Sequence, residues 1–129
     1  MVKMEKLTIA IIGGTGFEDF PFPVPDKTVR IKTAAGTVSM RRGEYRGSQI
    51  YFMLRHGDKH VAPHEVNYRA NALALHHIGA QAILTSAAVG SLQPHHTPGD
   101  FLLLDDFIDL TRSRPLTVLN APSKRKVIA

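Results

Sequence analysis

The amino-acid sequence predicts an α/β fold with a mixed, twisted sheet flanked by helices. Short apolar runs rich in β-branched residues recur along the chain, and glycine or polar loops follow them. One longer segment carries apolar residues at helical spacing. The resulting order of strand, hairpin, strand, helix, strand and strand is typical of α/β proteins. At 129 residues we expect one domain at most.

Four strands are expected before the helix, at residues 7–12, 28–33, 37–42 and 49–54. The first run is apolar and β-branched and ends in glycines, so it predicts a central strand. Three prolines between residues 21 and 25 then exclude a regular helix or an inner strand. The next two runs alternate weakly, and residues 43–47 predict a turn into the apolar fourth strand.

Residues 63–78 predict a helix that packs on one face of the sheet. Pro63 suits a first helical turn, where its missing N–H costs nothing. Gly79 suits the position just after the last turn. The face at helical spacing consists of Val66, Ala70, Leu73, Ala74 and His77. Further strands are expected at residues 82–86 and 100–104, and the runs 7–12, 49–54 and 82–86 should be buried neighbours.

Three of these strands are followed by loops that suit an anion. Residues 13–16 are Gly-Gly-Thr-Gly, Arg55 and His56 follow the fourth strand, and residues 87–91 are Ala-Ala-Val-Gly-Ser. Open α/β sheets bind ligands at the carboxyl ends of their strands. A guanidinium offers a planar fork of donors to phosphate. The sequence therefore predicts an oxyanion pocket where the loops meet.

Known phosphate motifs do not explain the glycine loop. A dinucleotide fingerprint that starts at Gly14 would need glycine where Asp19 stands, and the prolines prevent the helix that should follow. A Walker loop would need Gly-Lys-Ser or Gly-Lys-Thr, which is missing. Taken alone, the loop is better explained as a tight turn.

Two other clusters have competing interpretations. His56, His60 and His64 are spaced by four, but glycine and proline interrupt a helix through them and the chain has no cysteine, so we expect no metal site. The carboxylates are Asp105, Asp106 and Asp109. They suit either acid–base chemistry or a structural turn paired with nearby arginines.

Composition narrows the class of protein. The net charge is +5, but its basic residues cluster in a hairpin and in the last residues, and only 7% of residues are aromatic. We therefore expect no nucleic-acid partner. No apolar run reaches membrane-spanning length and no signal peptide is visible, so we expect a cytoplasmic protein without a membrane partner.

Taken together, the motifs resemble the trimeric purine nucleoside phosphorylase and methylthioadenosine phosphorylase family. The residues that carry the resemblance lie between about residues 7 and 115. They comprise the run from Ile11 to Phe17, Arg55-His56-Gly57 with His60, the run from Pro63 to Leu75, Ala87 to Leu92, Pro98-Gly99-Asp100, and Asp105 to Asp109.

The resemblance implies a reaction, a fold and an assembly. Family members use inorganic phosphate to cleave the N-glycosidic bond of a purine nucleoside or methylthionucleoside, and they release the free base and a (methylthio)ribose 1-phosphate. It implies no cofactor besides phosphate as co-substrate, and a homo-oligomer that is a trimer in the family.

Site roles also follow from the resemblance. It assigns phosphate binding to Thr15, Arg55, His56 and Ala88. It assigns substrate binding to His60, beside the 5′ side of the ribose, and to Ala87, the neighbour of Ala88. Residues that would hold the purine are not among the matched positions, so no catalytic residue is assigned.

The match also sets an expected boundary. We expect residues 1–115 to be the amino-terminal portion of a phosphorylase domain, incomplete as a fold, and residues 116–129 to be a divergent basic tail. The alternative function is therefore a truncated, catalytically inactive fragment that binds phosphate.

Overall fold

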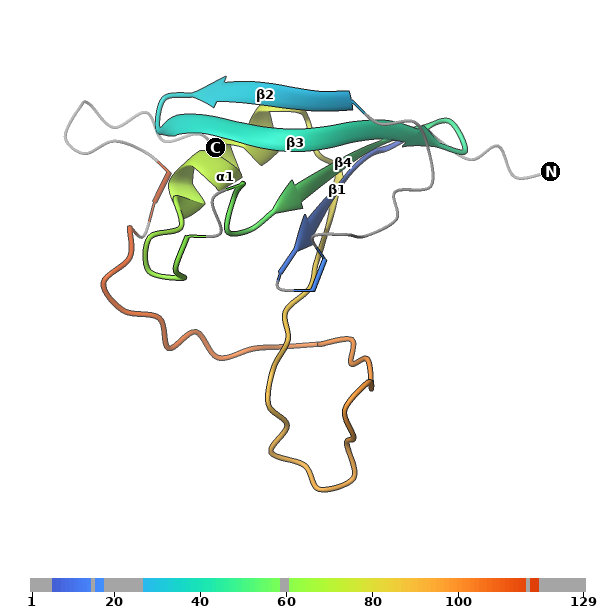
Figure 1. Ribbon diagram of the computed structural model, residues 1–129, viewed down its shortest axis with the longest axis vertical. Coiled ribbons are helices and arrows are strands. Elements are labelled where there is room, and N and C mark those ends of the chain that lie inside the picture. The colour runs from blue at the N-terminus through green and yellow to red at the C-terminus, as the bar shows by residue number, and fades with distance from the viewer. Residues whose placement is uncertain (1–5, 15, 18–26, 59–60, 116, 119–129) are drawn as a thin grey trace.

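The computed structural model describes residues 6–14, 16–17, 27–58, 61–115 and 117–118. Its elements, in chain order, are β1 (Thr8–Gly13), β2 (Lys27–Thr33), β3 (Gly36–Tyr45), β4 (Ser48–Leu54), α1 (Tyr68–His77) and β5 (Ala82–Thr85). The five strands form one sheet in the order β2-β3-β4-β1-β5. Figure 1 shows α1 lying against one face of this twisted sheet. The predicted α/β class with a mixed sheet is confirmed.

The sheet has an antiparallel half and a parallel half. β2, β3 and β4 pair antiparallel, whereas β1 pairs parallel with β4 on one side and with β5 on the other. The register sets Ile12 of β1 beside Met53 and Thr85. The expected neighbours β4, β1 and β5 are thus confirmed, and their carboxyl ends lie side by side at one end of the sheet.

The hairpin between β3 and β4 is tighter than predicted. β3 continues to Tyr45, which pairs with Ser48, so the turn is only Arg46 and Gly47 rather than residues 43–47. Both turn residues have positive φ, 49° and 83°. Two-residue hairpins favour this backbone because its twist matches that of the strands.

The core lies between α1 and the β3–β4 part of the sheet. Val38, Met40 and Met53 point from the strands toward Ala70 and Ala74 of the helix, and all five are buried. Two alanines at helical spacing let the helix approach the sheet closely. β2 contributes half-buried side chains to the same cluster.

The helix begins five residues later than predicted. The side chain of Asn67 accepts a hydrogen bond from Ala70 N at 2.9 Å and donates one to Ala35 O at 2.8 Å. This cap starts the helix at Tyr68 and ties it to the β2–β3 turn. Residues 63–65 form a turn instead. The predicted end is confirmed, since Gly79 has a φ of 66° just beyond the helix.

Two predictions about the second half of the chain are wrong. Residues 100–104 form no strand, because no strand of the described chain lies beside them. β5 is exposed rather than buried, since it is the edge of the sheet and α1 packs on the other half. Most of the predicted tail, residues 119–129 with residue 116, lies outside the described residues.

Residues 87–115, which we name the arm, leave the sheet after β5, loop below it without helix or strand and return toward α1 (Figure 1). The arm's large apolar side chains face solvent: Leu92 is 100% exposed, Phe101 93% and Leu103 99%. An exposed apolar surface of this kind, next to an open strand edge, promotes association.

We therefore expect the 129-residue protein to self-associate through the arm and the β5 edge. Its mass in sedimentation should rise with concentration, and it should bind a hydrophobic dye. The double variant Leu103→Lys, Ile108→Lys should reduce both effects, while Thr28→Lys on the far edge of the sheet should not. A constant monomer mass without dye binding would contradict the exposed arm.

Candidate functional site

Two backbone hydrogen bonds bring three loops together at the end of β1. Arg55 N donates to Gly13 O at 2.9 Å, and Ser86 N donates to Ile12 O at 3.0 Å. The chain that leaves β4 and the chain that leaves β5 are therefore fixed on opposite sides of the glycine loop. We name this junction of Gly13, Gly14, Arg55 and Ser86 the corner.

Arg55 points its guanidinium at the glycine loop. A Cβ placed on Gly14 would lie 3.0 Å from Arg55 Nη2 and 3.0 Å from Ser86 O. The guanidinium therefore lies against the Gly14 backbone at the end of β5. A side chain at position 14 would crowd both atoms, and the corner gathers a positive charge beside the loop after β1.

His56 contacts the side chain of Arg55. Its Nδ1 is 2.9 Å from Val61 O, and its Nε2 accepts a hydrogen bond from Arg55 Nε at 3.4 Å. The backbone of Arg55 is held from α1, because Asn71 Nδ2 donates to Arg55 O at 3.4 Å. The strand end, the imidazole and the helix thus all constrain the same arginine.

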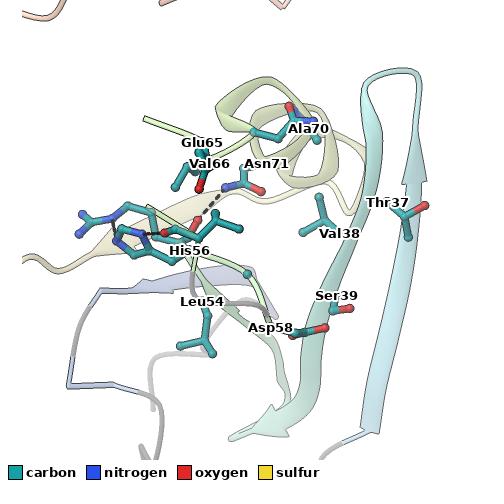
Figure 2. Close-up of a pocket in the computed structure, with 14 residues that line it drawn as sticks. Thr37, Val38, Ser39, Leu54, His56, Asp58, Glu65, Val66, Ala70 and Asn71 are labelled. Atoms are coloured by element: carbon teal, nitrogen blue, oxygen red, sulfur yellow. Dashed lines mark hydrogen bonds between the residues drawn. The ribbon is translucent and has the colours of Figure 1, made fainter. Parts of the chain in front are cut away.

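A pocket of about 340 Å³ opens between β3, the end of β4 and the start of α1. Figure 2 shows His56 on one side of it and Thr37 and Val38 of β3 on the other. Arg55 lines the pocket too, whereas Gly13, Gly14 and Ser86 of the corner do not. The uncharged walls come from β3 and α1, and the carboxylates of Asp58 and Glu65 lie in the loops between.

Ser86 is a functional candidate that the sequence analysis missed. Its Oγ is buried and has no hydrogen-bond partner among the described residues. A buried hydroxyl without a partner is costly, and such groups often serve a ligand. In the sequence, Ser86 was only the last residue of a predicted strand, and nothing distinguished it from residues 82–85.

The structure describes only two of the other predicted site residues. Thr15 and His60 lie outside the described residues. Ala87 and Ala88 follow Ser86 directly and are exposed, at the start of the arm. The roles assigned to all six residues stay predictions.

The competing sites gain no support. No group of three His, Asp or Glu side chains among the described residues is placed to share a metal ion. The three carboxylates of the arm are exposed, and Asp109 Oδ1 accepts from Thr111 N at 2.9 Å and Thr111 Oγ1 at 2.6 Å. These contacts form a local turn, but its hydrogen bonds come from Thr111 and not from the arginines of the predicted turn. No described helix is long and apolar enough to cross a membrane.

Gly14→Ala should destabilise the protein because the new Cβ would press on the guanidinium and on the Ser86 carbonyl. We expect a loss of about 1–3 kcal/mol in the free energy of unfolding, measured with urea. Gly90→Ala is the matched control, since a Cβ there meets nothing within 4 Å. Equal effects of the two variants would contradict the packed corner.

The turn at Asp109 should depend on pH. Hydrogen bonds from the side chain and the backbone of Thr111, with Arg114 nearby, hold the pKa of Asp109 below its usual value of 3.8. The turn is therefore stabilised above that value and loses this stabilisation as pH falls through the lower pKa.

In an NMR titration the Thr111 amide should shift with a midpoint below 3.8, and Thr111→Val should move the midpoint upward. A midpoint at or above 3.8 in the unmodified protein would exclude the described turn.

Comparison with known proteins places this geometry in a family. Residues 8–128 match the Phosphorylase superfamily. The chain is 42% identical over 125 residues to the 6-oxopurine nucleoside phosphorylase of Pyrococcus furiosus, a match that covers 94% of this chain and 47% of the relative. It is 42% identical to the S-methyl-5'-thioadenosine phosphorylase of Thermofilum pendens, over 92% of this chain and 47% of the relative.

Comparison with solved structures points to the same family. The methylthioadenosine phosphorylase from Schistosoma mansoni in complex with adenine superposes with a TM-score of 0.65 at 37% identity, over 74% of this chain and 35% of that one. The chain spans about half the length of the curated relatives it matches. Because the match runs from residue 8 to residue 128 of 129, the chain belongs to the phosphorylase superfamily.

Proposed function

We propose that the corner holds the phosphate of a nucleoside phosphorylase reaction. Phosphate attacks the C1′ carbon of a purine nucleoside or methylthionucleoside, the N-glycosidic bond breaks, and the products are the free purine and (methylthio)ribose 1-phosphate. The observation that carries the proposal is the Arg55 guanidinium, held against Gly14 where the loops after β1 and β5 meet. The activities for which the two relatives are named support the reaction class.

The physics of the corner suits this role. Phosphate must be held as an anion beneath a sugar that becomes positively charged, so a fixed cation and polar donors stabilise the nucleophile in place. Charge-assisted hydrogen bonds contribute roughly 1.5–3 kcal/mol each. Arg55 supplies the charge, and we assign the partnerless hydroxyl of Ser86 as a further donor.

Further parts of the proposal come from the family resemblance. Thr15, His56 and Ala88 would complete the phosphate contacts, and His60 with Ala87 would lie toward the sugar. No cofactor is required beyond inorganic phosphate as co-substrate. The family assembly would be a homotrimer in the cytoplasm.

A second candidate function is oxyanion binding without turnover. It is favoured by the arm, whose apolar side chains lie in solvent rather than over the corner. In the described part of the chain, these residues close no nucleoside pocket. Incubating the 129-residue protein with phosphate and methylthioadenosine, inosine or guanosine separates the two functions, because release of free purine occurs only in the first.

Arg55→Ala should weaken binding of phosphate or sulfate by at least about 10-fold, since the site loses its charge-assisted bonds. Arg42→Ala is the matched control. Arg42 is exposed on the β3–β4 hairpin, where its Nε donates to Gln49 Oε1. Calorimetric titration measures both dissociation constants. Equal weakening in the two variants would mean that general positive charge, not the corner, binds the anion.

Ser86→Ala should have opposite effects on stability and binding. Removing a buried hydroxyl without a partner should raise the free energy of unfolding in ligand-free buffer by about 1 kcal/mol. Losing a donor should weaken sulfate binding by about 5-fold. Urea unfolding and calorimetry measure the two quantities. If Ser86→Ala leaves sulfate affinity unchanged, Ser86 is not a ligand.

A further inference from the structure

We propose that the first turn of α1 forms a clasp that holds the far end of the arm, so that the arm is a closed strap and not a free tail. The clasp consists of Tyr68 and Arg69 of α1, Arg114 at the end of the arm and Val118 just beyond it. Figure 1 shows the chain returning toward α1 at this point. No residue of the clasp belongs to the corner, so the inference is independent of the proposed oxyanion site.

The first contact of the clasp is a cation–π contact. The central carbon of the Arg114 guanidinium lies 4.3 Å from the centroid of the Tyr68 ring, inside the limit of about 6 Å for such contacts. The ring is itself held, because Tyr68 Oη donates to Pro63 O at 3.2 Å. The arm therefore ends on an aromatic face whose direction is fixed by the turn before α1.

The second contact comes from the next residue of the helix. Arg69 Nε donates to Val118 O at 2.9 Å, a contact that spans 49 residues of sequence. The donor is charged, which strengthens the hydrogen bond. Two adjacent residues of α1 thus contact the returning chain at separate points, and together they set its direction as well as its position.

The near end of the arm is fixed by the sheet. Ser86 N donates to Ile12 O at 3.0 Å directly before the arm begins. Between its two ends the arm forms local turns, such as the one in which Thr97 N donates to Asp100 Oδ2 at 2.8 Å. No residue of the arm is buried. Packing of apolar side chains therefore does not hold the arm in place, and the clasp has to do so.

The clasp acts against the entropy of a long loop. Closing a flexible loop costs conformational entropy that rises slowly with loop length, and local turns reduce this cost because they stiffen the chain. Both contacts of the clasp lie at the surface, where a cation–π contact shifts an equilibrium by only about 2–5-fold. The strap should therefore open when either contact is removed.

The test is the distance between α1 and the arm. Because the chain contains no cysteine, two spin labels can be attached at chosen sites. Ala72→Cys with Leu110→Cys labels the exposed side of α1 and the exposed end region of the arm. Pulsed electron resonance, with unlabelled protein in excess so that each distance lies within one chain, should give a narrow distribution. Ala72→Cys with Thr28→Cys is the reference pair, because it joins the helix to the sheet without involving the arm.

Variants of the clasp should broaden the first distribution and leave the reference distance unchanged. Tyr68→Leu keeps an apolar side chain without an aromatic face, so the ratio of closed to open arm should fall by about 2–5-fold. Tyr68→Phe keeps the ring and should stay closed. Arg114→Gln should open the arm to the same extent, whereas Arg112→Gln, at an exposed arginine two residues earlier, should not.

Arg114→Gln decides the matter if Tyr68→Leu disturbs the helix and moves the reference distance, because Arg114 lies in the exposed arm and outside the core. A broad α1-to-arm distribution in the unmodified protein would overturn the proposal. The same closed fraction in Arg114→Gln and Arg112→Gln would overturn it as well, since the arm would then be held by something other than the clasp.

Discussion

The site depends on the parallel pairing of β1 with both β4 and β5. Parallel strands end at the same edge of a sheet, so this pairing places the chain after β4 and the chain after β5 on either side of the glycine loop. The bonds from Arg55 N to Gly13 O and from Ser86 N to Ile12 O extend the two ladders past the strands. Without them, the arginine and the serine would have no fixed relation to the loop.

The antiparallel half of the sheet and α1 support the corner indirectly, because they hold the backbone of Arg55 in place. Met40 and Met53 form one buried cluster with Ala70 and Ala74, which seats the helix on the antiparallel half of the sheet. From that position Asn71 reaches the carbonyl of Arg55. The core thus holds the backbone of the arginine, whereas His56 holds its side chain, and the two supports come from separate parts of the fold.

Local patterns predicted most of the architecture. Apolar runs rich in β-branched residues located β1 and β4, which are partly or fully buried, because burial on a sheet selects such residues. Weak alternation located β2 and β3, and an apolar run located β5 although that strand is exposed. The start of α1 was missed because the cap of Asn67 depends on Ala35, which is distant in sequence. The expected strand at residues 100–104 was wrong because a strand also requires a partner, which an apolar run cannot supply alone. Arg55 was found from its chemistry, whereas Ser86 was missed because only burial without a partner distinguishes it.

The central claim is that the corner at the carboxyl ends of β1, β4 and β5, and not the basic hairpin, binds an oxyanion. A sulfate titration followed by proton–nitrogen NMR of the backbone amides tests this claim residue by residue. The account predicts saturable shifts concentrated at Gly14, Arg55 and Ser86, with little change at Arg41 and Arg42. Shifts spread over the hairpin, or none at the corner, would contradict it.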